Sequence, residues 1–245
     1  MNKRQNRLLI ILISLFIFSL SACKNNSSDP LTVVNNSIPE IKEVIEPQEI
    51  KHKIKSLLDS NLWAEIHSGE NNILVEMRYA SEDNFMNKKV YPCSRCFFRP
   101  VVAQKIIEIA DILAKQDLRI KLLDCYRPAH FQHELWNAVP DWRYVAPPIK
   151  GSMHGRGLGV DLTLCDTMGK ELNMGTPYDY FGRETRHDYL DYPLNILENR
   201  KKIKTAMIDA GFIAGRSEWW HYSFPAKFPL DSIVWNCDSL ETETP

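Results

Sequence analysis

A glycine-rich stretch at residues 152–161 constrains the fold of this chain more than any other segment. It reads SMHGRGLGVD, with three glycines in five positions at Gly155, Gly157 and Gly159. Glycine adopts backbone conformations that other residues avoid, so the chain can turn tightly here and bring His154 and Asp161 together. The stretch runs into an alternation of apolar and polar residues from 159 to 164, which predicts a β-strand.

Other segments predict a mixture of helices and strands. Pro100 begins a helix with apolar residues at a spacing of three to four, and residues 195–210 form another that ends at Gly211, a residue type suited to the left-handed cap. Further strands are expected at Ile73–Tyr79, Arg119–Asp124 and Glu218–Phe224. Because these elements follow no regular βαβ rhythm, we expect an α+β fold, a single domain with a central antiparallel sheet flanked by helices.

The N-terminus has the layout of a signal peptide. Lys3, Arg4 and Arg7 precede an apolar run of 13 residues, which is shorter than the ~20 residues that a membrane-spanning helix needs. The run ends at Leu20-Ser21-Ala22-Cys23, which resembles the lipobox of bacterial lipoproteins. That resemblance implies cleavage after residue 22 and acylation of Cys23. The alternative is a plain secreted protein with an incidental cysteine.

We therefore predict three parts: a signal peptide at residues 1–22, a lipidated cysteine with a flexible tether at 23–50, and one folded domain at 51–245. The tether is rich in Asn, Ser, Pro and Glu and too poor in apolar residues to pack. The expected location is extracytoplasmic, on the periplasmic side of a membrane that holds the lipid anchor. Without the N-terminal basic residues, 27 basic residues stand against 31 acidic ones, which gives no reason to expect nucleic-acid binding.

His154 and Asp161 are candidate metal ligands. A hydrolytic zinc site commonly uses three protein ligands drawn from His, Asp, Glu or Cys and leaves a fourth position for water. The glycines between His154 and Asp161 would let both side chains reach one ion. A candidate for the third ligand is His221, which lies in the aromatic segment SEWWHY three residues after Glu218.

Glu218 and His221 can serve one site only if the backbone bends between them. Residues three apart on an ideal strand face opposite sides, so a bulge or bend is required. If the two converge, His221 completes the zinc site, and Glu218 takes a proton from the zinc-bound water and passes it to the leaving amine. Arg127, just after the strand predicted at 119–124, would supply a cation for the scissile carbonyl oxygen.

Five cysteines remain after Cys23, in a compartment expected to permit disulfides. Because five is an odd number, at least one must stay unpaired. Cys93 and Cys96 form a Cys-x-x-Cys motif, but no second such motif or His pair follows at a spacing suitable for a zinc site. We expect these cysteines to be structural, with room for one disulfide, and leave the pairing open.

Taken together, these segments resemble one known family, the D-alanyl-D-alanine dipeptidases, which are zinc peptidases related to D,D-carboxypeptidases and to the hedgehog signalling domain. The resemblance spans roughly residues 73–224 and includes several motifs in the same order. They are Arg78-Tyr79-Ala80, Asp83-Asn84-Phe85, Tyr126-Arg127-Pro128, the stretch 152–164, Met174-Gly175-Thr176 with Asp179, and Glu218-Trp219-Trp220-His221. Several motifs in order are far more specific than any one of them.

The resemblance implies that the domain at residues 51–245 is a zinc peptidase domain with its metal site in a cleft over the sheet. His154, Asp161 and His221 would hold one zinc ion per chain. Glu218 would be the catalytic base, and Arg127 would steady the transition state. The roles that the resemblance implies agree with those suggested by the residues themselves.

The resemblance also implies a substrate and its contacts. Ser152 would line the substrate pocket, and Asp179 would hold the free amino group of a dipeptide. We expect zinc-dependent hydrolysis of D-alanyl-D-alanine to D-alanine, in cell-wall dipeptide turnover, while the choice between salvage and glycopeptide resistance stays open. The alternatives are a D,D-carboxypeptidase or other peptidoglycan peptidase on the same fold and, less favoured, a non-catalytic binding lipoprotein stabilised by zinc. The oligomeric state stays open.

Overall fold

The central element of the fold is a five-stranded sheet with the strand order β2-β4-β5-β7-β6. Its strands are β2 (Ile73–Val75), β4 (Arg119–Asp124), β5 (Gly159–Cys165), β7 (His221–Ser223) and β6 (Ile213–Ala214). All neighbouring strands are antiparallel except β2 and β4, which are parallel. The prediction of an antiparallel sheet is wrong for this pair, because the chain crosses from β2 to β4 through β3 (Cys96–Phe98) and α2 (Pro100–Ala114) and re-enters in the same direction.

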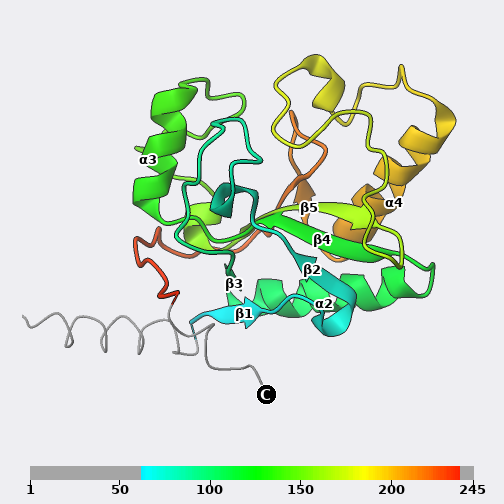
Figure 1. The fold of residues 1–245 in the computed structure, drawn as a ribbon, viewed down its shortest axis with the longest axis horizontal. Helices are drawn as coiled ribbons and strands as arrows, with labels where there is room; N and C mark the ends of the chain where they lie inside the picture. Colours follow the sequence, from blue (N-terminus) through cyan, green and yellow to red (C-terminus); the bar gives the residue numbers. More distant parts are fainter. Residues whose placement is uncertain (1–61, 238–245) are drawn as a thin grey trace, which may run out of the picture. The chain divides into compact units, whose positions relative to one another are not determined.

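The computed structural model describes residues 62–237, so the predicted signal peptide, Cys23 and the tether lie outside the described residues. The described part falls within one compact unit, Ile45–Pro245. It forms an α+β fold, as predicted (Figure 1). None of the helices in this part combines the length and the apolar character that a membrane span requires.

A second sheet consists of two antiparallel strands, β1 (Ala64–Ile66) and β3. The connections contain four short 3-10 helices, which are η1 (Glu70–Asn72), η2 (Arg78–Ala80), η3 (His154–Arg156) and η4 (Arg183–Thr185). The helix α3 (Ala129–Ala138) follows β4 directly in the chain. These connections, rather than the strands, supply most of the side chains discussed below.

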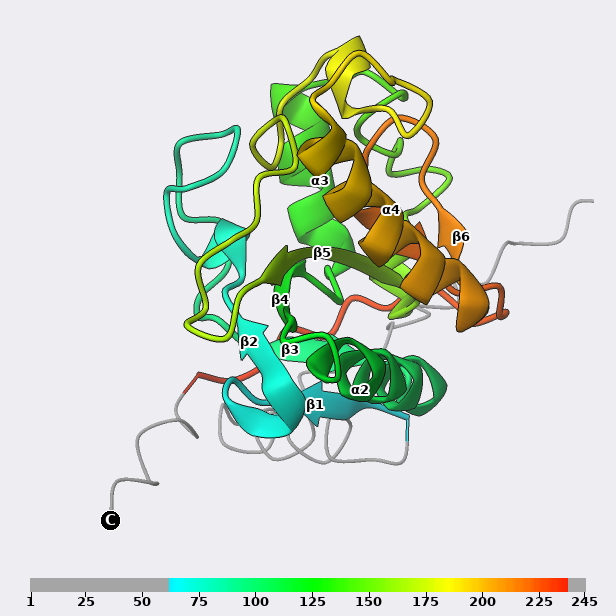
Figure 2. The same ribbon diagram turned by 90° about the vertical axis from the view of Figure 1, so that its right-hand side faces the viewer.

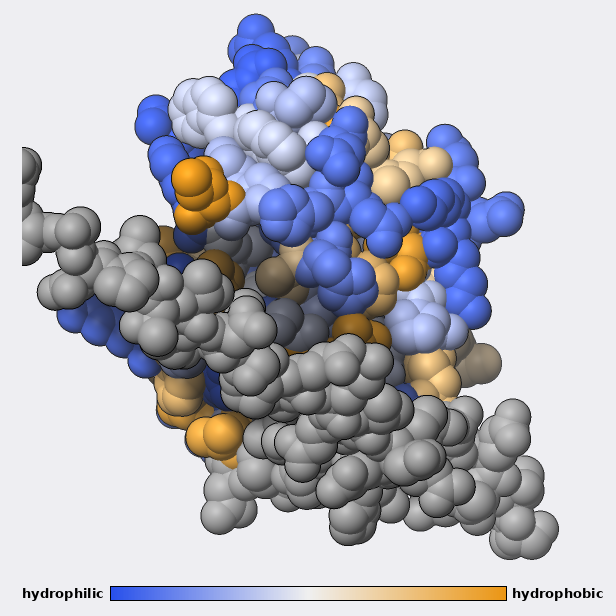
Figure 3. Space-filling model, turned by 90° about the vertical axis from the view of Figure 1, so that its left-hand side faces the viewer, coloured by the Kyte–Doolittle hydropathy of each residue, from blue (hydrophilic) through white to orange (hydrophobic). Residues whose placement is uncertain are grey.

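The core lies between the five-stranded sheet and two long helices, α2 and α4 (Leu194–Asp209), as Figures 1 and 2 show. The buried residues of α2 recur every three to four positions and are Val102, Ala103, Ile106, Ile109, Ala110 and Leu113. This spacing places them on one face of the helix, which packs against the sheet and α4. On the face shown in Figure 3, by contrast, hydrophobic residues lie scattered among hydrophilic ones, which is normal for a protein surface.

Two predicted strands are shorter than expected. The strand predicted at 73–79 ends at Val75, because the chain turns into η2 and buries Tyr79. The strand predicted at 218–224 begins only at His221, because the preceding residues form a bend. The bounds predicted for β4 are confirmed, and the helix predicted at 195–210 starts and ends one residue earlier, with Gly211 at φ +96° behind it.

The five cysteines within residues 62–237 form two disulfides, Cys93–Cys237 and Cys96–Cys125, and leave Cys165 buried and free. The expectation that at least one cysteine stays unpaired is confirmed. The sequence analysis expected one disulfide, whereas the structure has two. Cys93 and Cys237 are 144 residues apart, and a pairing over such a distance depends on the tertiary fold.

Candidate active site

One pocket of about 260 Å³ is lined by all seven predicted site residues of the folded domain. They are Arg127, Ser152, His154, Asp161, Asp179, Glu218 and His221. Pockets for drug-sized ligands start at about 300 Å³, so this pocket suits a ligand smaller than a typical drug molecule. The fold therefore brings together side chains that lie up to 94 positions apart in the sequence.

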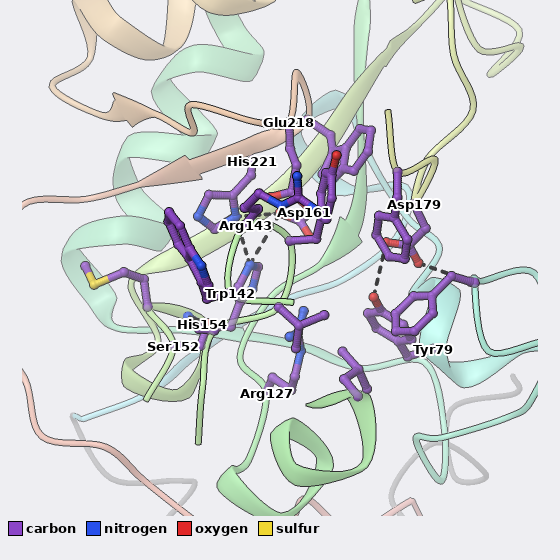
Figure 4. Close-up of a pocket in the computed structure, with 18 of the residues that line it drawn as sticks. Tyr79, Arg127, Trp142, Arg143, Ser152, His154, Asp161, Asp179, Glu218 and His221 are labelled. Carbon is purple, nitrogen blue, oxygen red and sulfur yellow. Dashed lines mark hydrogen bonds and ion pairs between the residues drawn. The ribbon is translucent and has the colours of Figure 1, made fainter. Parts of the chain in front are cut away.

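His154, Asp161 and His221 form a cluster in the middle of this pocket (Figure 4). Asp161 on β5 pairs directly with His221 on β7, and His154 begins η3, just before β5. The Nε2 atom of His154 lies 3.1 Å from Nδ1 of His221 and 3.3 Å from Oδ1 of Asp161. Nδ1 of His221 lies 2.8 Å from the same Oδ1 atom.

These three atoms fit a zinc ion in both chemistry and spacing. Two imidazole nitrogens and a carboxylate oxygen are common zinc ligands, with bonds of about 2.0–2.2 Å, which separate the ligand atoms of a tetrahedron by roughly 3.3 Å. The observed separations of 2.8–3.3 Å are close to that value. Within residues 62–237, these three side chains are the one group of His, Cys, Asp or Glu residues placed closely enough to hold a metal ion.

Each of the three cluster residues is held in place by a hydrogen bond to a group outside the cluster. Nδ1 of His154 donates to the backbone carbonyl of Cys125 at 2.7 Å, which leaves the lone pair of Nε2 facing the cluster. The hydroxyl of Tyr178 donates to Oδ2 of Asp161 at 3.0 Å, and Nε2 of His221 is hydrogen-bonded to Oγ of Ser223 at 3.1 Å. Metal-binding side chains are commonly oriented by partners of this kind.

The charges in the cluster favour the ionised form of Asp161. Burial opposes ionisation, but the imidazoles of His154 and His221 hold the pKa of Asp161 well below its usual range. Burial would also lower the pKa of His154, yet the carboxylates of Asp161 and Asp124 raise it. Asp161 is therefore a carboxylate, the form that binds metals.

The backbone bend that Glu218 and His221 require is present. The chain bends at residues 219–220, between Glu218 and β7, and both side chains line the pocket. Burial, and then the negative charges of Asp161 and Asp179, raise the pKa of Glu218 well above its usual range, while Arg127 opposes this rise. A carboxyl group with a raised pKa is suited to accept a proton and later to release it.

Arg127 is fixed by a buried network. Its Nε donates to Oδ2 of Asp124 at 3.0 Å, its Nη2 donates to the same oxygen, and its Nη1 donates to Oε1 of Gln132 at 2.9 Å. The hydroxyl of Tyr91 donates to the other oxygen of Asp124 at 2.7 Å. Burial would lower the pKa of Arg127, but Asp124 raises it well above its usual range, so a permanent cation lies at the pocket wall.

Asp179 lies on the side of the pocket opposite Ser152 in the view of Figure 4. The hydroxyl of Tyr79 donates to its Oδ1 at 3.2 Å, and the backbone N–H of Phe85 donates to its Oδ2 at 3.4 Å. Burial, and then the charge of Asp161, raise the pKa of Asp179 to about 8. Arg127 opposes this rise, but within residues 62–237 no cation forms an ion pair with Asp179, so the carboxyl group is suited to a positively charged ligand group.

Several residues of the site were given no role from the sequence, although Tyr79, Phe85 and Trp220 lie within motifs of the family resemblance. The pocket is also lined by Tyr79, Phe85, Trp142, Arg143 and Trp220, and supporting contacts come from Asp124, Gln132 and Tyr178. Asp124 and Tyr178 each adjoin a motif of the family resemblance, and that position could have identified them. The sequence around Trp142 and Arg143 has no comparable pattern, because their place at the pocket depends on how the loop between α3 and η3 folds back.

The loop that begins β5 provides a prediction about stability. Gly157 has φ +70°, and a Cβ atom there would lie 2.4 Å from the Trp63 ring and 3.2 Å from the backbone nitrogen of Arg99. Gly69 has φ +94° but open space around it. We expect Gly157→Ala to lower the free energy of unfolding by about 1–3 kcal/mol more than Gly69→Ala, because only the first variant adds a clash to the backbone cost. Urea unfolding of both variants measures the difference, and equal losses would contradict this packing.

Comparisons with known proteins point in one direction. A family model described as D-ala-D-ala dipeptidase matches residues 63–236. The D-alanyl-D-alanine dipeptidase of Escherichia coli (strain K12) is 33% identical over 165 residues, covering 66% of this chain and 86% of that protein. The D-alanyl-D-alanine dipeptidase of Enterococcus faecium is 30% identical over 169 residues, covering 60% of this chain and 83% of that protein. The matched range contains every residue of the pocket.

Proposed function

Because this chain belongs to the D-Ala-D-Ala dipeptidase family, we propose that it is a zinc-dependent dipeptidase that hydrolyses D-alanyl-D-alanine to two molecules of D-alanine. The observation that carries this proposal is the convergence of His154, Asp161 and His221 beside Glu218 in one small pocket. Such a set provides three metal-binding atoms and a separate proton acceptor, which are the parts that a metallopeptidase requires.

The zinc ion would be held by Nε2 of His154, Oδ1 of Asp161 and Nδ1 of His221. When bound, zinc supplies a Lewis acid that makes water a better nucleophile and polarises the scissile carbonyl. The carbonyl of Cys125, the hydroxyl of Tyr178 and the hydroxyl of Ser223 would keep the three side chains oriented toward the ion.

Glu218 would move the proton that the reaction requires. Its carboxylate accepts a proton from the attacking water, and the resulting carboxylic acid delivers that proton to the leaving amine when the C–N bond breaks. The raised pKa of Glu218 supports both steps. Arg127 would donate hydrogen bonds to the carbonyl oxygen as that oxygen gains negative charge.

The charges of the pocket support one orientation of the substrate. The free ammonium group would lie against Asp179, and the carboxylate end would lie toward Ser152, on the opposite side of the metal cluster (Figure 4). Tyr79 and Phe85 bind Asp179 directly and would limit the room beyond the ammonium group. This arrangement supports a dipeptide rather than a longer peptide as the substrate.

Activity and zinc content of the purified full chain test this proposal. We expect about one zinc ion per chain, release of D-alanine from D-alanyl-D-alanine, loss of activity with a chelator, and recovery when zinc is restored. Cleavage of a peptidoglycan pentapeptide instead of the free dipeptide would favour the D,D-carboxypeptidase. Zinc binding without hydrolysis of either substrate would favour a non-catalytic binding lipoprotein.

Asp179→Asn is expected to lower kcat/KM for D-alanyl-D-alanine by roughly 10- to 150-fold, because the variant loses a charge-assisted hydrogen bond to the ammonium group. Below a pH of about 8 the Asp179 carboxyl is mostly protonated, given its raised pKa. The wild-type kcat/KM should therefore rise as the pH approaches 8. The part of this rise that comes from Asp179 should be absent in the variant, whereas the part that comes from ionisation of Glu218, whose pKa is also raised, should remain. The pH profiles of both proteins measure this, with Asp188→Asn on the surface as the control. An unchanged profile in Asp179→Asn would refute the assignment.

We propose that the enzyme is an extracytoplasmic lipoprotein attached to the membrane through Cys23 and active in the turnover of cell-wall dipeptides. The two disulfides support this location, because disulfides persist in oxidising compartments. Cys23→Ala should move the protein from the membrane fraction to the soluble fraction, as measured by cell fractionation and immunoblotting. A variant that stays with the membrane would refute anchoring through this cysteine.

A further inference from the structure

The Cys96–Cys125 disulfide is connected to the metal cluster through a single residue, Cys125. The carbonyl oxygen of Cys125 accepts the hydrogen bond from Nδ1 of His154 at 2.7 Å. The Cys125 side chain is bonded to Cys96 on β3, and both cysteines are buried. The residue that orients His154 is therefore covalently tied to the second, two-stranded sheet.

This bond lies where β4 leaves the sheet. The pairing of β4 with β5 shifts register between Leu122 and Asp124, so the regular ladder ends just before Cys125. Beyond that point, the backbone N–H of Tyr126 donates to the carbonyl of Phe97 at 3.0 Å. The disulfide and this hydrogen bond together tie the end of β4 to β3.

The same short segment positions Arg127 as well. The backbone N–H of Arg127 donates to the carbonyl of His154 at 3.2 Å, while the Arg127 side chain is bonded to Asp124. Residues 124–127 thus hold two members of the site through both backbone and side-chain contacts. A shift of this segment would move His154 and Arg127 together.

We propose that the Cys96–Cys125 disulfide is a positioning element of the zinc site: it fixes the carbonyl that orients His154. This inference rests on the zinc site proposed above. In the disulfide-bonded protein, His154 is held in the tautomer and orientation that point Nε2 at the metal. In the dithiol form, the end of β4 is less constrained, so binding zinc must also reorder the segment that carries the Cys125 carbonyl.

The Cys93–Cys237 disulfide provides a matched control. It closes a much longer loop, with a separation of 144 residues against 29. The chain before Cys237 is held independently, because Trp235 is buried and the hydroxyl of Tyr126 donates to the carbonyl of Ile233 at 3.1 Å. Loop length predicts that losing this disulfide affects unfolding at least as strongly, whereas neither of its cysteines touches the metal cluster.

The test measures the zinc affinity of the full chain by competition with a chromophoric chelator. We expect Cys96→Ala/Cys125→Ala to bind zinc about 10- to 100-fold more weakly than the wild type, the range seen when the contact that orients a metal ligand is disturbed. Cys93→Ala/Cys237→Ala should keep wild-type affinity. Equal zinc affinity in the wild type and Cys96→Ala/Cys125→Ala, or an equal loss in both variants, would overturn the inference.

A second measurement decides the matter even if Cys96→Ala/Cys125→Ala fails to fold. In the Cys93→Ala/Cys237→Ala background, a phosphine reduces the remaining disulfide to two thiols and is itself converted to its oxide. Zinc affinity should fall on reduction and return after reoxidation, and a constant affinity would overturn the inference. If the wild type binds no zinc, the proposed function fails as well. If it binds zinc with an affinity independent of this disulfide, only the present inference fails.

Discussion

Glu218→Gln is expected to lower kcat for D-alanyl-D-alanine by about 10²- to 10⁴-fold, the usual contribution of a general base. The amide has nearly the same shape as the carboxyl group, but it cannot accept a proton from water. The zinc content should stay unchanged, because Glu218 is not among the three residues that would hold the ion. Steady-state kinetics and metal analysis of the same preparation measure both quantities.

Glu198→Gln is the matched control for this variant. Glu198 is exposed on α4 and does not line the active-site pocket, so its replacement should leave kcat and zinc content at wild-type values. If Glu218→Gln turns over the dipeptide at the wild-type rate with a full complement of zinc, Glu218 is not the base. The proton transfer would then have to use another group.

Arg127→Lys is expected to lower kcat by about 10²- to 10³-fold, the effect of losing one donor to a developing oxyanion. Lysine keeps the positive charge but lacks the planar fork. Its donors all start from one nitrogen, whereas Arg127 reaches Asp124 and Gln132 from separate nitrogens, so lysine aims a donor at the carbonyl oxygen less well. The dipeptide should still bind through Asp179, so kcat should fall much more than KM rises. The measurement is a steady-state comparison at saturating substrate.

Arg186→Lys controls for a general effect of replacing arginine by lysine. Arg186 forms a surface pair with Asp188, whose side chain is 69% exposed, and such pairs contribute little. Its kcat should match that of the wild type. Thermal unfolding of Arg127→Lys must be recorded as well, because Asp124 is fully buried and depends on a cationic partner. A folded Arg127→Lys variant with wild-type kcat would contradict the role assigned to Arg127.

Local pattern predicted much of the fold. The apolar spacing after Pro100 and the alternation after Gly159 describe how a helix and a strand bury one face, and both elements are present. The strand predicted at 73–79 was too long, because the burial of Tyr79 in a turn is a tertiary effect that local propensity does not contain. The parallel pairing of β2 with β4 was missed for a similar reason, since strand direction depends on the path between strands.

The sequence predicted the metal-binding and catalytic residues of the site, but it did not predict the residues that hold them in place. A histidine and an aspartate flanking closely spaced glycines, together with a Glu-x-x-His segment, indicate metal chemistry from the sequence alone. Gln132, which binds Arg127, and Tyr178, which binds Asp161, belong to no zinc motif. Their roles arise from packing between distant segments.

The sequence by itself determined which donor atoms are available: two imidazoles, several carboxylates and a guanidinium, in segments with the backbone freedom to turn. Only the tertiary structure decided that Asp161 and His221 face each other across paired strands and that Cys125 is bonded to Cys96. The physical reason is that covalent spacing limits contacts only between near neighbours in the chain. Contacts between distant segments are selected by burial of the whole core and by the register of the strands.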